Sequence, residues 1–224
     1  MSELERARNQ MVDVQIVERG VRDPQVLAAM RTVPREVFVE PGLEEFAYDD
    51  EPLPIDEGQT ISQPYIVARM IEAAELKSGE RALEVGTGSG YGAAVMSRIA
   101  HEVYTIERYP TLSAQAQQRF DKLGYSNIRL RVGDGSHGWP EAAPFDAILV
   151  TAGTPEIPAA LEEQLAIGGR LVIPVGDRLV GQTLRKIRRI GATTYEDDSL
   201  EAVRFVPLVG EDPSGRSSAP DSTL

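Results

Sequence analysis

Apolar positions recur at helical spacing near the start of the chain, and the pattern changes twice further on. The first stretch predicts a helix with one apolar stripe, formed by Leu4, Ala7, Met11, Val14 and Val17. A second short helix is expected to begin at Asp23-Pro24, where a capping residue precedes a proline suited to a first turn. Residues 34–62 are interrupted by prolines and lack periodicity, which favours a functional loop. The helical pattern then returns over 64–77.

Strand-like and helix-like segments alternate through the rest of the chain. Strands are expected at 81–85, 102–107, 128–132, 145–150 and 170–175, with helices near 90–100, 110–123 and 158–166. Such alternation predicts parallel strands joined by crossover helices, hence a doubly wound α/β sheet. Two last β-rich runs, about 179–190 and 201–209, have no helix between them. They are expected to form an antiparallel pair at one edge of the sheet.

The length and composition predict one soluble domain. It would span 1–210, with N-terminal helices and a loop at 1–78 and the sheet at 79–210, followed by a disordered tail at 211–224. The absence of cysteine excludes disulfides and fits a cytoplasmic protein. A net charge of −12 argues against a nucleic-acid partner. No apolar run approaches the roughly 20 residues that a membrane span needs, and a monomer is favoured.

The first predicted strand runs directly into a glycine-rich turn with an acidic residue before it. Glycines allow the backbone to turn sharply and to approach a ligand closely, and the N-terminus of the next helix attracts negative charge. A plain strand-to-helix turn could use the same residues, but Glu84 is placed to accept a hydrogen bond from a ligand ammonium group. Tyr91 stands where a dinucleotide fingerprint would have its third glycine, and no Gly-Lys-Ser/Thr follows. The candidate cofactor-binding residues are Glu84, Gly86, Thr87, Gly88, Ser89 and Gly90.

Acidic residues also end the next two predicted strands. Glu107 is placed to accept hydrogen bonds from a ribose diol, beside Arg108; the alternative is a solvated glutamate paired with that arginine. Asp134, followed by Gly135, would bind an adenine amino group or make an Asx-turn. An acid–glycine loop and two acids at successive strand ends together predict a site for S-adenosylmethionine (AdoMet).

Nearly the entire chain, from about Arg8 to Gly210, resembles the protein-L-isoaspartate (D-aspartate) O-methyltransferases. The resemblance implies a Rossmann-like AdoMet-dependent methyltransferase sheet whose N-terminal segment covers the substrate. It also implies methylation of the free α-carboxylate of L-isoaspartyl residues in damaged, flexible protein segments, with activity toward D-aspartyl residues left open. The segments that carry it are Phe46-Ala47-Tyr48, Pro52 to Ile55, Gly58 to Pro64, Glu84 to Tyr91, Phe145 to Ala152, Gly168 to Gly176 and Val203 to Leu208.

The stretch Gly58 to Pro64 is the part specific to that family, and its serine matches Ser62. The resemblance implies that Ser62 is the active-site residue; the reaction needs no base, so we expect it to orient the substrate carboxylate. From the residues alone, Ser62 would cap the helix that Pro64 opens. Thr60 and Gln59 are candidate substrate contacts, with turn structure and loop hydrogen bonding as their alternatives.

Two positions depart from the family pattern. Asp56 stands where a glycine is common, which would place a negative charge near an anionic substrate, and Gly92 replaces a frequent glutamine. Neither histidine has carboxylates at metal-ligand spacing, so no metal site is predicted. Two other functions stay open: an enzyme that methylates ordinary aspartate in a dedicated peptide, and a non-catalytic AdoMet-binding protein.

Overall fold

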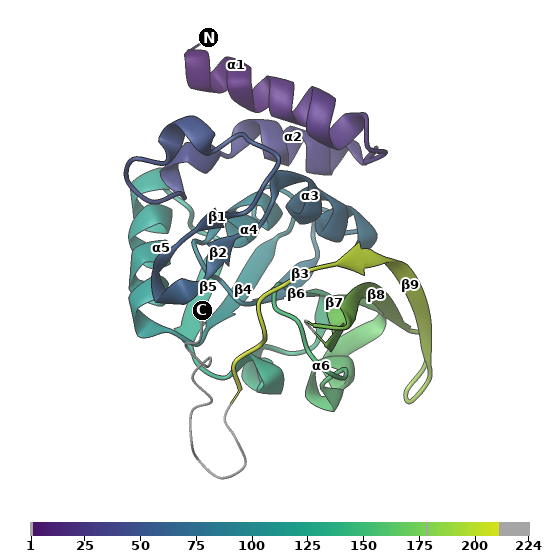
Figure 1. Ribbon diagram of the computed structural model, residues 1–224. Helices are drawn as coiled ribbons and strands as arrows, with labels where there is room; N and C mark the ends of the chain where they lie inside the picture. Colours follow the sequence, from purple (N-terminus) through teal and green to yellow (C-terminus); the bar gives the residue numbers. More distant parts are fainter. Residues whose placement is uncertain (1, 178, 211–224) are drawn as a thin grey trace.

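Seven strands form one twisted sheet at the centre of the computed structural model, which describes residues 2–177 and 179–210 (Figure 1). The strand order is β5-β4-β3-β6-β7-β8-β9. The pairs from β5 to β7 are parallel, whereas β8 pairs antiparallel with β7 and β9 antiparallel with β8. The predicted doubly wound fold with an antiparallel edge is therefore confirmed. The strands are β3 (Arg81–Val85), β4 (Glu102–Glu107), β5 (Ile128–Val132), β6 (Phe145–Val150), β7 (Leu165–Asp177), β8 (Gly181–Arg189) and β9 (Tyr195–Val203).

Hydrophobic residues alternate along the central strands and so cover both faces of the sheet. On β3, Ala82 joins the core with the N-terminal helices, and Leu83 joins the core on the other face. Because β4 and β6 flank β3, the chain order reverses at β3, and ligands of such sheets bind beyond the strand ends at this point. The helices that connect the strands are α3 (Pro64–Ala73), α4 (Tyr91–Met96), α5 (Pro110–Leu123) and α6 (Ala159–Glu163), with single 3₁₀ turns at Gly135–His137 and Pro140–Ala142.

The first helical stretch differs from the stripe that its sequence predicts. It consists of α1 (Glu3–Gln10) and a π-helical turn (Met11–Val17), followed after a short loop by α2 (Pro24–Thr32). The wider π-helical winding rotates the side chains, so that Val12 and Ile16 join Met11 in the core, whereas Val14 is 49% exposed. Asp23 caps α2 as predicted, with its carboxylate accepting the N–H groups of Gln25 and Val26.

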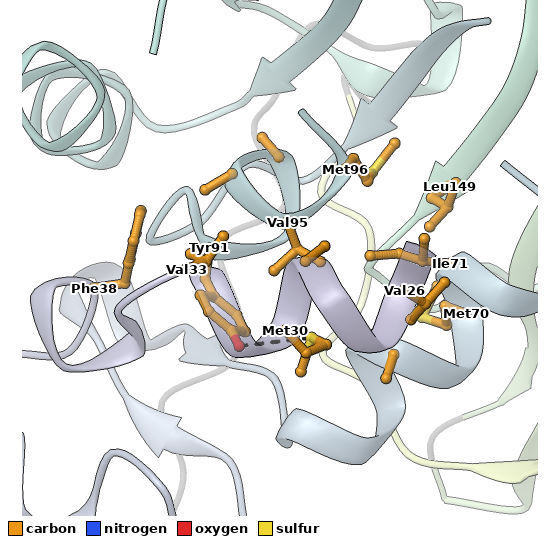
Figure 2. Close-up of a cluster of buried hydrophobic side chains, with 14 of the residues drawn as sticks. Val26, Met30, Val33, Phe38, Met70, Ile71, Tyr91, Val95, Met96 and Leu149 are labelled. Carbon is orange, nitrogen blue, oxygen red and sulfur yellow. Dashed lines mark hydrogen bonds between the residues drawn. The ribbon is translucent and has the colours of Figure 1, made fainter. Parts of the chain in front are cut away.

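The N-terminal helices pack directly on the short helix that follows the glycine loop. Tyr91, the first residue of α4, donates a hydrogen bond to Met30 Sδ at 3.7 Å, and its ring meets the Phe38 ring edge-on at 5.7 Å. Figure 2 shows the surrounding buried cluster, whose labelled members are Val26, Met30, Val33, Phe38, Met70, Ile71, Tyr91, Val95, Met96 and Leu149. The helical segment and the sheet thus share one hydrophobic core.

The irregular stretch at 34–62 contains short ordered elements. Two-residue strands β1 (Leu53–Pro54) and β2 (Thr60–Ile61) form an antiparallel hairpin around a 3₁₀ turn at Asp56–Gly58. Two further 3₁₀ turns lie at Arg35–Val37 and Glu44–Phe46. Buried Leu53, Ile55 and Ile61 hold the hairpin to the core.

Several sequence-based boundaries need correction. The strand expected at 201–209 lies earlier, at Tyr195–Val203. The first part of this edge strand is mostly polar and exposed, so its sequence has no apolar pattern that would predict a strand. The helix expected at 158–166 ends at Glu163, and the next strand begins at Leu165, so the strand expected at 170–175 is longer. The helix expected near 90–100 is only Tyr91–Met96. Residues 211–224, expected to form a disordered tail, lie outside the described residues.

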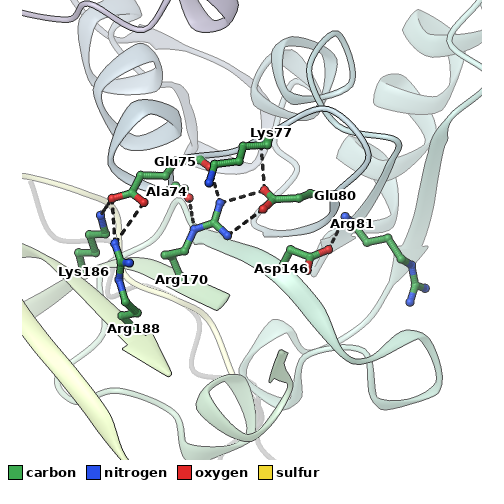
Figure 3. Close-up of polar contacts among 9 residues, drawn as sticks. All are labelled: Ala74, Glu75, Lys77, Glu80, Arg81, Asp146, Arg170, Lys186 and Arg188. Carbon is green, nitrogen blue, oxygen red and sulfur yellow. Dashed lines mark hydrogen bonds and ion pairs between the residues drawn. The ribbon is translucent and has the colours of Figure 1, made fainter. Parts of the chain in front are cut away.

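Arg170 ties the end of α3 to the antiparallel part of the sheet (Figure 3). Its guanidinium pairs with the Glu80 carboxylate at 2.9 Å and donates to the backbone carbonyls of Ala74, at 2.6 Å, and of Glu75. Glu75 has a positive φ of 50°, as residues just past a helix end often do. Its carboxylate accepts from Lys186 and Arg188 on β8.

Candidate active site

The glycine loop follows β3 with the close backbone approach that its sequence predicts. Gly86 and Gly90 both have positive φ, of 97° and 93°. A Cβ at Gly86 would lie 2.5 Å from Thr151 Oγ1, and one at Gly90 would lie 2.8 Å from the Phe120 ring. Only glycine fits both positions.

Glu84 lies beneath this loop and is 1% exposed. Its Oε2 accepts the Thr105 hydroxyl at 2.7 Å, and the Thr87 and Thr105 hydroxyls lie 2.6 Å apart. Burial raises the pKa of the Glu84 carboxyl to about 8, and the hydrogen bond from Thr105 opposes that rise. The missing side chain of Gly92 leaves room for this carboxylate, because a Cβ there would lie 2.2 Å from Glu84 Oε1.

Glu107 ends β4 with its carboxylate turned into the site, and it is 5% exposed. One carboxylate oxygen accepts the Gly88 N–H at 2.7 Å, and the other accepts the Tyr109 N–H at 2.9 Å. Burial raises its pKa, and these backbone N–H groups oppose the rise. The alternative of a solvated glutamate does not describe this buried group. A carboxylate has about four acceptor sites, so these N–H groups leave room for a hydrogen bond from a ligand hydroxyl.

Asp134 takes the local role that its sequence left open. Its carboxylate accepts the N–H of Ser136 at 2.8 Å and the hydroxyl at 2.7 Å, which caps the turn at Gly135–His137. Gly135 packs against Val85, where a Cβ would lie 2.3 Å from Val85 Cγ1. The Asx-turn interpretation is therefore correct, and the contact with adenine stays a prediction.

A narrow cavity of about 60 Å³ connects these strand ends and lies between two covering segments. The β1–β2 hairpin contributes Gln59 and Thr60, and the C-terminal segment contributes 206–209. The predicted residues that line it are Gly86, Gly88, Glu107, Arg108 and Gly135. Glu84, Thr87 and Ser89 line an adjoining cavity of about 50 Å³ on the other side of the loop. The structure thus brings most of the predicted cofactor residues together along the sheet edge, whereas Gly90 and Asp134 line neither of these two cavities.

A third cavity, of about 620 Å³, opens beside the loop between α3 and the end of β9. Ser62 and Thr60 line both this cavity and the one beneath the glycine loop. Two charged residues on its walls form ion pairs: Arg19 pairs with Asp50 at 2.8 Å, and Glu201 pairs with Arg69 at 3.0 Å. The remaining wall residues are Pro52, Gln63, Ile66, Thr151 and 202–206.

The three substrate candidates differ in their surroundings. Ser62 precedes α3, but the N-cap residue is Gln63 and no side chain caps the helix, so the capping interpretation of Ser62 is wrong. Thr60 is exposed at the edge of the hairpin. Gln59 donates to the Glu57 carbonyl at 3.1 Å and lines the cofactor cavity, not the large one, which supports its role within the loop.

Asp56, which departs from the family pattern, accepts a hydrogen bond from Gln115 at 2.7 Å and does not line the large cavity.

Two threonines belong to the site although the sequence analysis did not select them. Thr151 follows β6, donates to the Gly86 carbonyl at 2.7 Å and lines all the cavities described here. Its position after a parallel strand beside β3 is the signal that identifies it. Thr105 is fully buried within β4, and only its register opposite Glu84 reveals its contact.

Over residues 2–177 and 179–210, no three metal-ligating side chains gather into a cluster. Nor does any helix in those ranges have the length and hydropathy of a membrane span.

The cradle fits AdoMet in its chemistry: a glycine loop without space for side chains, a buried acid beneath it and a second buried acid at the next strand end. Together with the sheet order, this defines the chain as an AdoMet-dependent methyltransferase. The sequence profile of the protein-L-isoaspartate(D-aspartate) O-methyltransferases matches residues 6–213. The chain belongs to that family.

Similar proteins agree with this assignment. A protein-L-isoaspartate O-methyltransferase of Pelobacter propionicus is 59% identical over 203 residues, which cover 91% of this chain and 90% of the relative. One of Brucella anthropi is 57% identical over 210 residues, covering 94% and 96%.

Two solved structures share the fold. One is named protein-L-isoaspartate O-methyltransferase; it matches with a TM-score of 0.83 at 30% identity over 91% of this chain and 66% of its own length. The other is a putative protein-L-isoaspartate O-methyltransferase of Plasmodium falciparum in complex with S-adenosyl-L-homocysteine. It matches with a TM-score of 0.78 at 27% identity over 90% of this chain and 97% of its own.

Proposed function

We propose that this methyltransferase transfers the methyl group of AdoMet to the free α-carboxylate of L-isoaspartyl residues in damaged proteins, with Ser62 and Thr60 orienting that carboxylate. The observation that carries the proposal is the shared wall of two cavities. Ser62, Thr60 and Thr151 line both the space beneath the glycine loop and the large cavity, which has a volume of about 620 Å³. A carboxylate placed at this wall lies next to the cofactor.

The chemistry asks for orientation and exclusion of water, not for proton transfer. A substrate carboxylate with a pKa of about 4 is ionised at neutral pH. AdoMet supplies a methyl group that is activated by its positively charged sulfur. The hydroxyls of Ser62 and Thr60 align the carboxylate oxygen, and the hairpin covers the reacting atoms. In the methyl ester, the backbone nitrogen of the next residue displaces methanol to give a succinimide, and hydrolysis returns part of it to aspartate.

The discriminating experiment compares two peptides that differ only in the aspartyl linkage. Labelled methyl transfer from AdoMet is expected to the isoaspartyl peptide and to be at background for the aspartyl one. Equal labelling of both would instead indicate an enzyme that modifies ordinary aspartate. A chain that binds AdoMet without labelling either peptide would be a non-catalytic binding protein.

Ser62→Ala is expected to lower kcat/KM for the isoaspartyl peptide by about tenfold, which corresponds to one lost hydrogen bond to a charged group. Because the hydroxyl caps no helix, the melting temperature and the affinity for S-adenosylhomocysteine should stay unchanged. Ser97→Ala is the matched control, since this serine bonds the Ala94 carbonyl on α4. A Ser62 variant with full activity would show that the hydroxyl does not orient the substrate.

We further propose that the enzyme works as a cytoplasmic monomer. The absence of cysteine supports a reducing compartment.

A further inference from the structure

A buried hydroxyl lies behind the acidic residue of the cofactor loop. Thr105 sits in the middle of β4, directly opposite Glu84 of β3 in the parallel register, and its exposed fraction is zero. Its hydroxyl lies 2.7 Å from Glu84 Oε2 and 2.6 Å from Thr87 Oγ1. It therefore joins the loop to the acid without entering the cavity itself.

The order of donors in this chain follows from the number of hydrogens. Each threonine hydroxyl has one hydrogen to donate. When Glu84 is ionised it only accepts, so Thr105 donates to Glu84 and Thr87 must donate to Thr105. Both hydroxyl hydrogens then point toward the carboxylate, an arrangement that stabilises its negative charge.

The other neighbours of the Glu84 carboxylate leave Thr105 as its side-chain donor. On the α4 side lie Gly92, which has no side chain, and the backbone N–H of Ala93, which also favours the charged form. The charged group that acts on it is Glu107, whose negative charge opposes ionisation. Burial opposes it more strongly, and these effects together raise the pKa of Glu84 to about 8. Because the pKa of Glu84 is raised, a proton on the free acid competes with a ligand ammonium over a wider pH range than it would at an exposed glutamate.

We propose that Thr105 is a positioning residue for the methyl donor that acts through Glu84: its hydroxyl stabilises the ionised carboxylate that pairs with the ammonium group of AdoMet. The proposal rests on the assignment of that ammonium to Glu84. Thr105 itself touches neither cofactor nor substrate.

Binding and proton release are linked in this arrangement. A ligand ammonium favours ionised Glu84, so binding below about pH 8 releases the proton that the free enzyme holds. Removing the Thr105 hydroxyl raises the pKa of Glu84 further. Each added unit of pKa weakens binding about tenfold while the acid is protonated. Above the new pKa the acid is ionised in both free and bound enzyme, and the deficit vanishes.

The test compares Thr105→Val with the unaltered enzyme by titration calorimetry with S-adenosylhomocysteine, which carries the same ammonium group. The ratio of the two dissociation constants is expected to be about tenfold near pH 7 and to approach one as the pH rises above about 9. The ligand's own titration affects both proteins alike and cancels in the ratio. Titrations in buffers of different ionisation enthalpy should show that the unaltered enzyme releases a proton on binding, and that this release fades as the pH rises above about 9.

Two further variants separate positioning from packing. Thr105→Ser keeps the hydroxyl and should bind as tightly as the unaltered enzyme. Thr154→Val removes another buried threonine hydroxyl, which donates to the Pro174 carbonyl. This variant should leave the dissociation constant of S-adenosylhomocysteine unchanged at every pH. A deficit in Thr105→Val that is the same at every pH, or a Thr105→Ser variant as weak as Thr105→Val, would overturn the proposal.

Failure of the underlying assignment gives a different result. If the unaltered enzyme binds S-adenosylhomocysteine without releasing a proton at any pH from about 5 to 9, Glu84 does not pair with the ammonium, and the role of Thr105 falls with it. The paired-peptide assay does not depend on this result, so the methyltransferase function is tested separately.

Discussion

If Glu107 binds the ribose diol as predicted, Glu107→Gln is expected to weaken the binding of S-adenosylhomocysteine by about 100-fold, because hydrogen bonds from ribose hydroxyls to a charged acceptor are lost or weakened. The amide also introduces a donor group against the N–H groups of Gly88 and Tyr109, which both point at the carboxylate. Titration calorimetry measures the effect.

Glu102→Gln is the matched control for this change. Glu102 lies at the opposite end of the same strand, where it accepts from Tyr104 and Arg129. Its replacement should leave the dissociation constant unchanged. If the Glu107 variant binds within about threefold of the unaltered enzyme, the carboxylate does not contact the ribose.

Arg170→Met is expected to lower the free energy of unfolding by about 3 to 5 kcal/mol, the usual cost of removing one partner from a buried ion pair. The Arg170 side chain is 6% exposed and that of Glu80 is 18% exposed, so solvent replaces the lost partner poorly. The carbonyls of Ala74 and Glu75 also lose their donor. Urea unfolding measures the change, provided that the slope with denaturant is the same in both proteins.

The control for Arg170 is an exposed pair on the neighbouring strands. Arg185 pairs with Asp197, and both side chains are 34% exposed. Arg185→Met should therefore cost less than about 1 kcal/mol. Equal losses in the two variants would mean that the buried network around Arg170 contributes no more than a surface pair.

The parallel half of the sheet is predictable from the sequence because its strands are apolar and end in residues that mark turns. Arg81–Val85 runs into three glycines, and the acidic residues at 107 and 134 follow the next two strands. The start of the edge strand β9 could not be predicted because it has no apolar pattern. Its residues Glu196, Asp197 and Asp198 are exposed and pair with β8 through the backbone.

Site residues could be predicted where the residue type itself indicates a role. They could not be predicted where the contact depends on how two strands are aligned. Glycines without room for a Cβ and a buried Glu107 belong to the first kind. A threonine in a strand is ordinary, and only the alignment of β3 with β4 places Thr105 on Glu84. Similarly, the π-helical winding at Met11–Val17 decides which side chains face the core, and a regular helical period does not describe it.

The packing of Tyr91 on the N-terminal helices couples cofactor binding to the stability of those helices. A helix of six residues such as α4 is too short to hold its own conformation. Its start, and with it the loop at Gly90, depends on Met30 and Phe38 from the chain's first forty residues. By mass action, a cofactor that binds only the assembled loop stabilises those distant helices as well, in proportion to the logarithm of its concentration. Cofactor supply would then govern how long the enzyme survives as well as how fast it works.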